Sequence, residues 1–164
     1  MAISALMFTT TTFWGLPSDS DQPIHIQADG GEMDQKQGTA LYTGNVRLNR
    51  GTMKVSADTM TVELNDDDKL TQLTATGKKG GQQANFQQKV EAEKAVVFAD
   101  ADVIVYFADE EKIELRGNAH LTQDGNELRG QLIIYDVRAG KVDASAAPGQ
   151  KINIIFQPNA IKLP

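Results

Sequence analysis

The two histidines could do the widest range of chemistry in this chain, since an imidazole can act as an acid, a base or a metal ligand. They are His25 and His120, and each lies on the polar side of an alternating apolar–polar segment. Neither has a cysteine partner, a second histidine two residues away or an HExxH context, the patterns that zinc sites use. We therefore interpret both as solvated strand histidines and predict no metal site.

Two charged segments share only part of the pattern of known ligand-binding loops. The run from Asn65 to Lys69 holds three aspartates, but it lacks the glycine and the distal glutamate of an EF-hand loop and predicts a charged hairpin turn. The glycines around Lys78 and Lys79 have no GK[ST] after them, so they indicate a flexible basic loop that could meet an anionic head group. No Ser-His-Asp arrangement is indicated. The sequence predicts no catalytic residue, no cofactor and no enzyme.

Composition narrows the class of protein further. The 164 residues carry 16 Lys and Arg against 22 Asp and Glu, a net charge of −6, which argues against a nucleic-acid partner. The chain has no cysteine, so a disulfide framework and a thiolate nucleophile are excluded. Its length is that of a single domain with a substantial core.

Short alternating segments predict the fold class, because one apolar and one polar face is typical of antiparallel strands. They recur about every eight to twelve residues, the spacing of a sandwich, jelly roll or barrel. Pairs such as Gly44-Asn45 and Gly117-Asn118 predict turns between them. The stretch 89–98 could form a short helix, but we favour a strand there because strands are predicted on both sides.

An internal repeat supports the same class. Shifting the chain by 73 positions lays residues 41–64 over 114–137 without a gap, with Gly44-Asn45 on Gly117-Asn118 and the apolar positions in phase. We therefore expect a stack of similar strand–turn units that bury their apolar faces against one another.

The apolar side of these strands is either a plain core or a hydrophobic slot. The alternation alone favours the plain core, and it leaves the two edges of an unclosed sheet unpaired. The residues expected to line this interior are Val46, Leu48, Met60, Val62, Leu121, Ile133, Tyr135 and Ile154.

The N-terminal residues 1–15 are uncharged and partly apolar. We interpret them as the remnant of a secretory signal, with a disordered or strand-forming arm as the alternative. Residues 16–164 are then one domain.

The segment 21–29, DQPIHIQAD, resembles the opening of the LptA family, the periplasmic bridge proteins of lipopolysaccharide transport within the organic-solvent-tolerance-like proteins. Gly44-Asn45-Val46, Ala57-Asp58, Ala101-Asp102 and Gly117-Asn118-Ala119 follow the family pattern, and the similarity spans about residues 16–158. The later motifs are shared with LptC and with the periplasmic domain of LptD.

The resemblance implies a twisted, half-open β-jelly roll of roughly sixteen antiparallel strands, whose apolar slot holds the acyl chains of lipopolysaccharide. It places lipid contacts at Ile24, Ile26, Phe86 and Tyr106. It also implies a periplasmic bridge that meets LptC at its N-terminal edge, LptD at its C-terminal edge, and copies of itself head to tail. The alternative is a purely structural module that joins partners by strand addition and binds no lipid.

Overall fold

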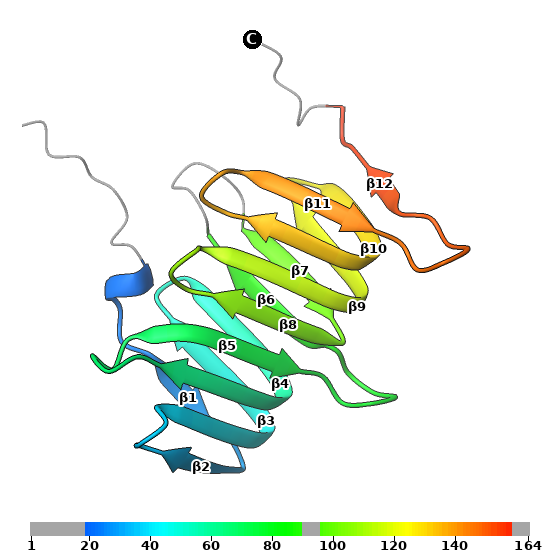
Figure 1. The fold of residues 1–164 in the computed structure, drawn as a ribbon. Helices are drawn as coiled ribbons and strands as arrows, with labels where there is room; N and C mark the ends of the chain where they lie inside the picture. Colours follow the sequence, from blue (N-terminus) through cyan, green and yellow to red (C-terminus); the bar gives the residue numbers. More distant parts are fainter. Residues whose placement is uncertain (1–18, 90–95, 159–164) are drawn as a thin grey trace, which may run out of the picture.

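The computed structural model describes residues 19–89 and 96–158 (Figure 1). The interpretation of residues 1–15 and most of the strand predicted over 89–98 lie outside them. Within these residues the chain forms a 3₁₀ turn, η1, and twelve strands. The elements are η1 (Asp19–Asp21), β1 (His25–Gln27), β2 (Gly30–Asp34), β3 (Thr39–Arg50), β4 (Met53–Leu64), β5 (Leu70–Thr76), β6 (Ala84–Gln88), β7 (Val97–Ala101), β8 (Val103–Phe107), β9 (Lys112–Gln123), β10 (Asn126–Asp136), β11 (Lys141–Ser145) and β12 (Asn153–Ile155).

The strands form two layers that share their four long members, β3, β4, β9 and β10. In one layer the order is β2-β3-β4-β5-β8-β9-β10-β11, and in the other it is β1-β3-β4-β6-β7-β9-β10-β12. All pairs are antiparallel. The described residues form twelve strands, fewer than the roughly sixteen that the resemblance implied. The number is lower because each of the four long strands runs through both layers and takes the place of two shorter strands.

Two of the four shared strands, β3 and β9, change layer at a glycine–asparagine bulge. The register between β3 and β4 shifts at Gly44-Asn45, where both residues have positive φ (77° and 48°). The predicted turn is therefore wrong at this position: the pair bends a continuous strand instead of ending it. A bulge bends a strand by adding an unpaired residue, and glycine and asparagine tolerate the left-handed backbone that this bend requires.

An aspartate fixes each bend. The Asp29 carboxylate accepts a hydrogen bond from Asn45 Nδ2 at 2.8 Å, and the Asp29 amide donates to the carbonyl of Gly44 at 2.9 Å. Asp102 makes the same two contacts with Asn118 and Gly117, both at 2.9 Å.

The repeat found in the sequence is thus a repeat of structure, and it is longer than 24 residues. Adding 73 to the bounds of β2 gives β8, and adding it to those of β3 gives β9. The register is also preserved, because Ile26 pairs with Leu48 as Ala99 pairs with Leu121.

Replacing Gly117 by alanine is expected to cost at least about 2 kcal/mol of folding stability. Gly117 has φ +79°, and a Cβ there would overlap the Asp102 carboxylate. Gly140→Ala is the matched control, since Gly140 has φ +63° and a Cβ there would meet no atom within 4 Å; it should cost only the backbone strain, about 1 kcal/mol. Urea unfolding of both variants measures the difference, and equal costs would contradict the role of the Asp102 contact.

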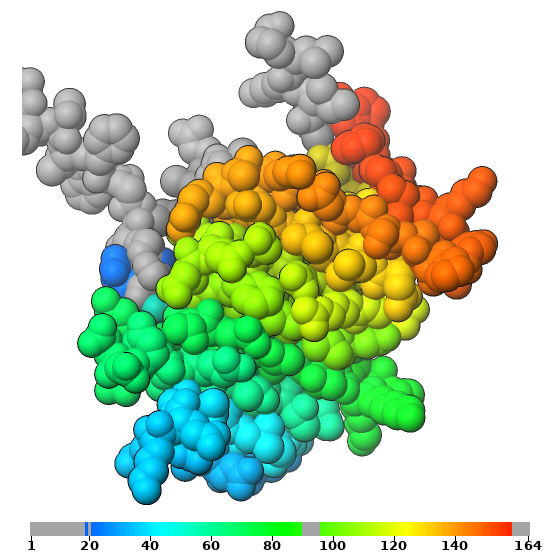
Figure 2. Space-filling view, in the orientation of Figure 1, coloured from blue at the N-terminus to red at the C-terminus, as the bar shows by residue number. Residues whose placement is uncertain are grey.

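The core lies between the two layers, which pack through their apolar faces. The first strands, in blue and cyan, and the last, in orange and red, lie at opposite ends of the body (Figure 2). Within residues 19–89 and 96–158, both layers therefore end in open edges: β1 and β2 at one end, and β11 and β12 at the other.

Candidate functional site

The structure places eleven of the twelve sequence-predicted site residues in or against one apolar interior, and it leaves the twelfth exposed. Nine of the twelve are buried, two are half-buried at the N-terminal end, and one is exposed at the C-terminal end. The buried ones are Val46, Leu48, Met60, Val62, Phe86, Tyr106, Leu121, Ile133 and Tyr135; the half-buried pair is Ile24 and Ile26; the exposed one is Ile154.

The middle of the interior is filled by side chains from both layers. Phe86 on β6 and Tyr106 on β8 face each other across it with ring centroids 6.0 Å apart. Burial raises the pKa of the Tyr106 phenol, and the nearby charge of Arg50 opposes that rise. Because both rings are almost wholly buried, a chain-like ligand can reach them only by displacing side chains or by parting the layers.

The N-terminal end of the interior is open. A hollow of about 420 Å³ lies there between β1, β2 and β3, and Met33 at its rim is 58% exposed. A Cβ on Gly31 would come within 2.9 Å of the Tyr42 ring, so the glycine lets this ring pack against β2. The residues that line the hollow are Ile26, Ala28, Gly30, Gly31, Glu32, Met33 and Tyr42. We call this hollow the N-terminal mouth.

Met33 and Tyr42 were not among the predicted site residues. Residues 30–34 have two glycines and two acidic side chains, so their composition does not suggest a strand. The 73-residue repeat carried the missing signal: extended towards the N-terminus, it places Met33 on Tyr106, which was predicted.

The C-terminal end exposes a second apolar surface. Val142 on β11 is 40% exposed, Ile154 on β12 is 47% exposed, and Phe156 just after β12 is 64% exposed. Ile154 was expected to line the interior, and its strand pairs with β10 opposite the half-buried Leu128. Nothing among the described residues covers its other side, because β12 pairs only with β10 there.

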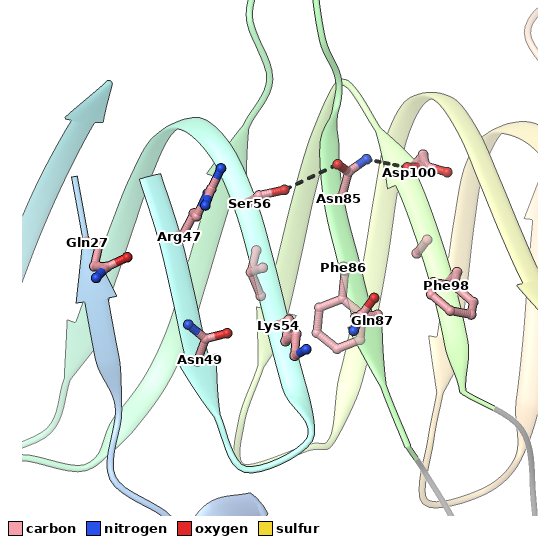
Figure 3. Close-up of a pocket in the computed structure, with 12 residues that line it drawn as sticks. Gln27, Arg47, Asn49, Lys54, Ser56, Asn85, Phe86, Gln87, Phe98 and Asp100 are labelled. Carbon is pink, nitrogen blue, oxygen red and sulfur yellow. Dashed lines mark hydrogen bonds between the residues drawn. The ribbon is translucent and has the colours of Figure 1, made fainter. Parts of the chain in front are cut away.

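The outer face of the layer formed by β1, β3, β4, β6 and β7 carries a polar hollow of about 590 Å³ (Figure 3). Arg47 and Lys54 supply positive charge, while Gln27, Asn49 and Asn85 supply amide groups. These side chains alternate along their strands with the buried ones. Asp100 adds a carboxylate, and the core residues Val55, Phe86 and Ala99 also line the hollow. The hollow could therefore hold a polar group against part of the apolar core.

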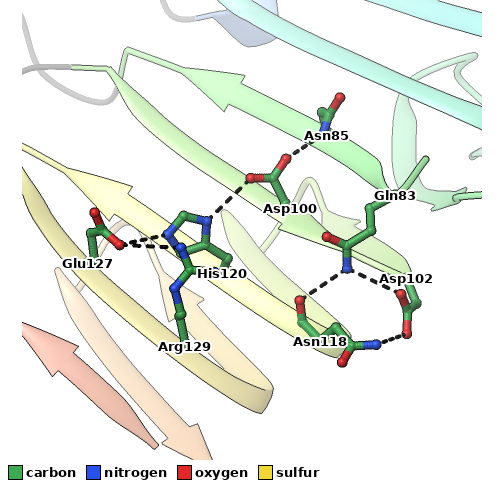
Figure 4. Close-up of polar contacts among 8 residues, drawn as sticks. All are labelled: Gln83, Asn85, Asp100, Asp102, Asn118, His120, Glu127 and Arg129. Atoms are coloured by element: carbon green, nitrogen blue, oxygen red, sulfur yellow. Dashed lines mark hydrogen bonds and ion pairs between the residues drawn. The ribbon is translucent and has the colours of Figure 1, made fainter. Parts of the chain in front are cut away.

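His120 is more enclosed than a solvated strand histidine. Its Nδ1 lies 3.5 Å from an Asp100 carboxylate oxygen, and its Nε2 lies 3.3 Å from a Glu127 oxygen (Figure 4). The expectation was right about the polar face and wrong about solvation, because β7 and β10 flank β9 and bring both carboxylates to the ring. His25 is exposed, as expected.

Among residues 19–89 and 96–158, no three His, Cys, Asp or Glu side chains are grouped so that they could hold a metal ion. The segment Asn65 to Lys69 forms the expected hairpin turn, in which the Asn65 side chain accepts hydrogen bonds from the amides of Asp67 and Lys69. In the same described part of the chain, no helix has the length and apolarity needed to cross a membrane.

The fold and the site define a class of protein: a two-layer β-sandwich built from a repeat, with an apolar interior and, among the described residues, an unpaired strand edge at each end. Residues 25–141 match the family model described as LptA/(LptD N-terminal domain) LPS transport protein. The chain belongs to this family, and the all-β prediction and the resemblance are confirmed.

Individual relatives agree with the family match. The chain is 35% identical over 150 residues to the lipopolysaccharide export system protein LptH of Pseudomonas aeruginosa, which covers 87% of this chain and 83% of that protein. It is 27% identical over 159 residues to LptA of Escherichia coli K12, covering 97% and 84%. The structure also resembles the crystal structure of LptH from Pseudomonas aeruginosa, described as the LptA homologous periplasmic component of the lipopolysaccharide transport device. The two match with a TM-score of 0.77 at 34% identity, and the match covers 87% of this chain and 100% of the LptH chain.

Proposed function

We propose that this protein is a periplasmic carrier that shelters the acyl chains of lipopolysaccharide in its apolar interior and bridges the inner- and outer-membrane parts of the transport machinery. The observation that carries the proposal is the N-terminal mouth, where the half-buried Ile26 and the exposed Met33 line an opening of the apolar interior to solvent. Family membership supports the substrate class.

Physical chemistry makes such a carrier possible without a covalent step. Each CH₂ group that leaves water gains about 0.8 kcal/mol, so several acyl chains can be held by burial alone. We propose that the chains enter at Ile24 and Ile26 and extend towards Phe86 and Tyr106. The remaining predicted lipid contacts are Val46, Leu48, Met60, Val62, Leu121, Ile133, Tyr135 and Ile154.

The open edges give the bridge its contacts. An unpaired strand edge presents free backbone N–H and C=O groups that an added strand satisfies. We propose that β1 and β2 meet LptC, that β11 and β12 meet LptD, and that copies of the chain join one another by the same edges. Since the two edges differ, the contact is heterologous and builds an open filament.

A photo-crosslinking side chain at Ile26 tests lipid binding in cells. We expect it to capture lipopolysaccharide, because this side chain lines the N-terminal mouth. The matched control is Gln27, the next residue of the same strand, which lies on the opposite face beside Arg47. A crosslinker there should capture at least about tenfold less.

Equal capture at Ile26 and Gln27 would contradict the carrier model. Strand addition without lipid capture would instead support the structural module, which is the competing function for this fold.

A further inference from the structure

We propose that two copies of the chain pair their edge strands in the same way as the two repeats pair within one chain. The internal seam is the set of strand pairs that joins the two repeats, β6 with β7 and β5 with β8. In this arrangement β12 and β11 of one copy pair with β1 and β2 of the next, in the registers that join β6 to β7 and β5 to β8. The inference rests on the end-to-end joining proposed above and adds the residue register of the contact.

The N-terminal edge of the chain is equivalent to the inner edge of the second repeat. β1 pairs with β3 as β7 pairs with β9: Gln27 lies opposite Arg47 as Asp100 lies opposite His120. β2 pairs with β3 as β8 pairs with β9, again at a constant shift of 73 residues. The pair β1 and β2 therefore presents the same backbone edge to a neighbour as β7 and β8 do.

The C-terminal edge of the chain is equivalent to the inner edge of the first repeat. β12 pairs with β10 as β6 pairs with β4, so Ile154 opposite Leu128 corresponds to Phe86 opposite Val55. β11 pairs with β10 as β5 pairs with β4. Within the described residues, β6 and β5 have a second neighbour, and β12 and β11 have none.

The two equivalences fix which residues of one copy lie opposite which residues of the next. Phe86 lies opposite Ala99 at the internal seam, so Ile154 falls opposite Ile26 of the next copy. The same register also sets the other exposed, inward-pointing apolar side chains of the C-terminal edge opposite apolar residues. It places Phe156 opposite Ile24, Ile152 opposite Ala28 and Val142 opposite Met33 of the next copy. Apolar surface that is exposed at both ends of one copy is thereby buried between two.

Between two copies, an ion pair takes the place of one polar contact of the internal seam. Gln83 donates from Nε2 to the Asp102 carboxylate at 3.2 Å and to the carbonyl of Asn118 at 3.1 Å (Figure 4). In the proposed register Lys151 takes the place of Gln83, and Asp29 of the next copy takes the place of Asp102. The seam between copies is therefore charge-assisted and weakens with salt.

The register carries one unfavourable charge pair. Asp143 falls opposite Glu32 of the next copy, and like charges directly opposite each other destabilise a strand pair. Lys141, which lies 3.2 Å from Asp143 in its own strand, falls opposite Asp34 of the next copy and offsets part of this repulsion.

Disulfide trapping tests the register, and the absence of native cysteine removes any background. A single-cysteine Asn153→Cys protein is mixed with a single-cysteine Gln27→Cys protein under mild oxidation. Both positions are exposed, and the register sets them directly opposite, within disulfide reach. The control mixes Asn153→Cys with His25→Cys, which is displaced by two residues on the same face. We expect the mixed dimer to form at least about tenfold faster in the first mixture.

Faster trapping of the His25→Cys pair, or a predominance of Asn153→Cys homodimers, would overturn the register. Sedimentation of the unmodified chain across concentrations separates this failure from failure of the bridge model. If the full chain forms larger species and a chain lacking residues 150–164 stays monomeric, the end-to-end joining is supported even when the trapped residue pair is wrong. A chain that stays monomeric throughout overturns both.

Charge reversal provides a second measurement. Lys151→Glu should weaken self-association about tenfold at low salt, because it sets a carboxylate against Asp29 of the next copy. Lys69→Glu makes the same charge change in the exposed β4–β5 hairpin and should leave association unchanged. If both substitutions weaken association equally, the change in net charge explains the loss, and this result would contradict the ion pair between Lys151 and Asp29.

Discussion

Replacing Ile26 by aspartate is expected to lower lipopolysaccharide affinity at least tenfold, about 1.4 kcal/mol, while the protein stays folded. The side chain is half-buried at the N-terminal mouth, so the substitution places a charge where the acyl chains enter. A carboxylate without a partner in an apolar site is costly. The fold should survive because β1 is an edge strand that pairs only with β3 among the described residues. Titration with purified lipopolysaccharide measures the affinity.

Gln27→Asp is the matched control for this prediction. It introduces the same carboxylate one residue further along β1, on the polar outer face. Its affinity should remain within about twofold of the parent. If both substitutions weaken binding equally, the loss comes from the added negative charge on the molecule, and the mouth is not the entry point.

Replacing Phe86 by alanine is expected to cost about 3–5 kcal/mol of stability, a large share of the 5–15 kcal/mol typical of a domain. Phe86 is only 1% exposed, lies opposite Val55 on β4, and packs against Tyr106 of the other layer. Truncation therefore leaves a cavity between the two layers. Urea unfolding, with its midpoint and slope compared to the parent, measures the loss.

Phe98→Ala is the control, because Phe98 is the same residue type on the adjacent strand. It pairs opposite Gln87 and is 49% exposed on the outer face, so its removal should cost about 1 kcal/mol or less. A cost for Phe86→Ala as small as that for Phe98→Ala would mean that the interior is loosely packed, as an empty slot would be.

The sequence by itself determined the fold class and the repeat. Side chains alternate across a strand with a period of two, so residues such as Val46 and Leu48 could be assigned to the interior without a structure. The Gly44-Asn45 and Gly117-Asn118 pairs marked equivalent positions in the two repeats, because a left-handed backbone restricts the residue type. The motif around Ile24 and Ile26 was sufficient to indicate the family.

Only the tertiary structure decided how these elements combine. Alternation tells which face of a strand is apolar, but it cannot tell which layer the strand joins or how far it lies from an open edge. It therefore could not show that Gly44-Asn45 bends one strand between two layers, or that Phe86 meets Tyr106 across them. His120 is enclosed because neighbouring strands bring Asp100 and Glu127 to it. Ile154 stays exposed because burial depends on a second neighbouring strand, and pairing between strands distant in sequence is a property of the assembled fold.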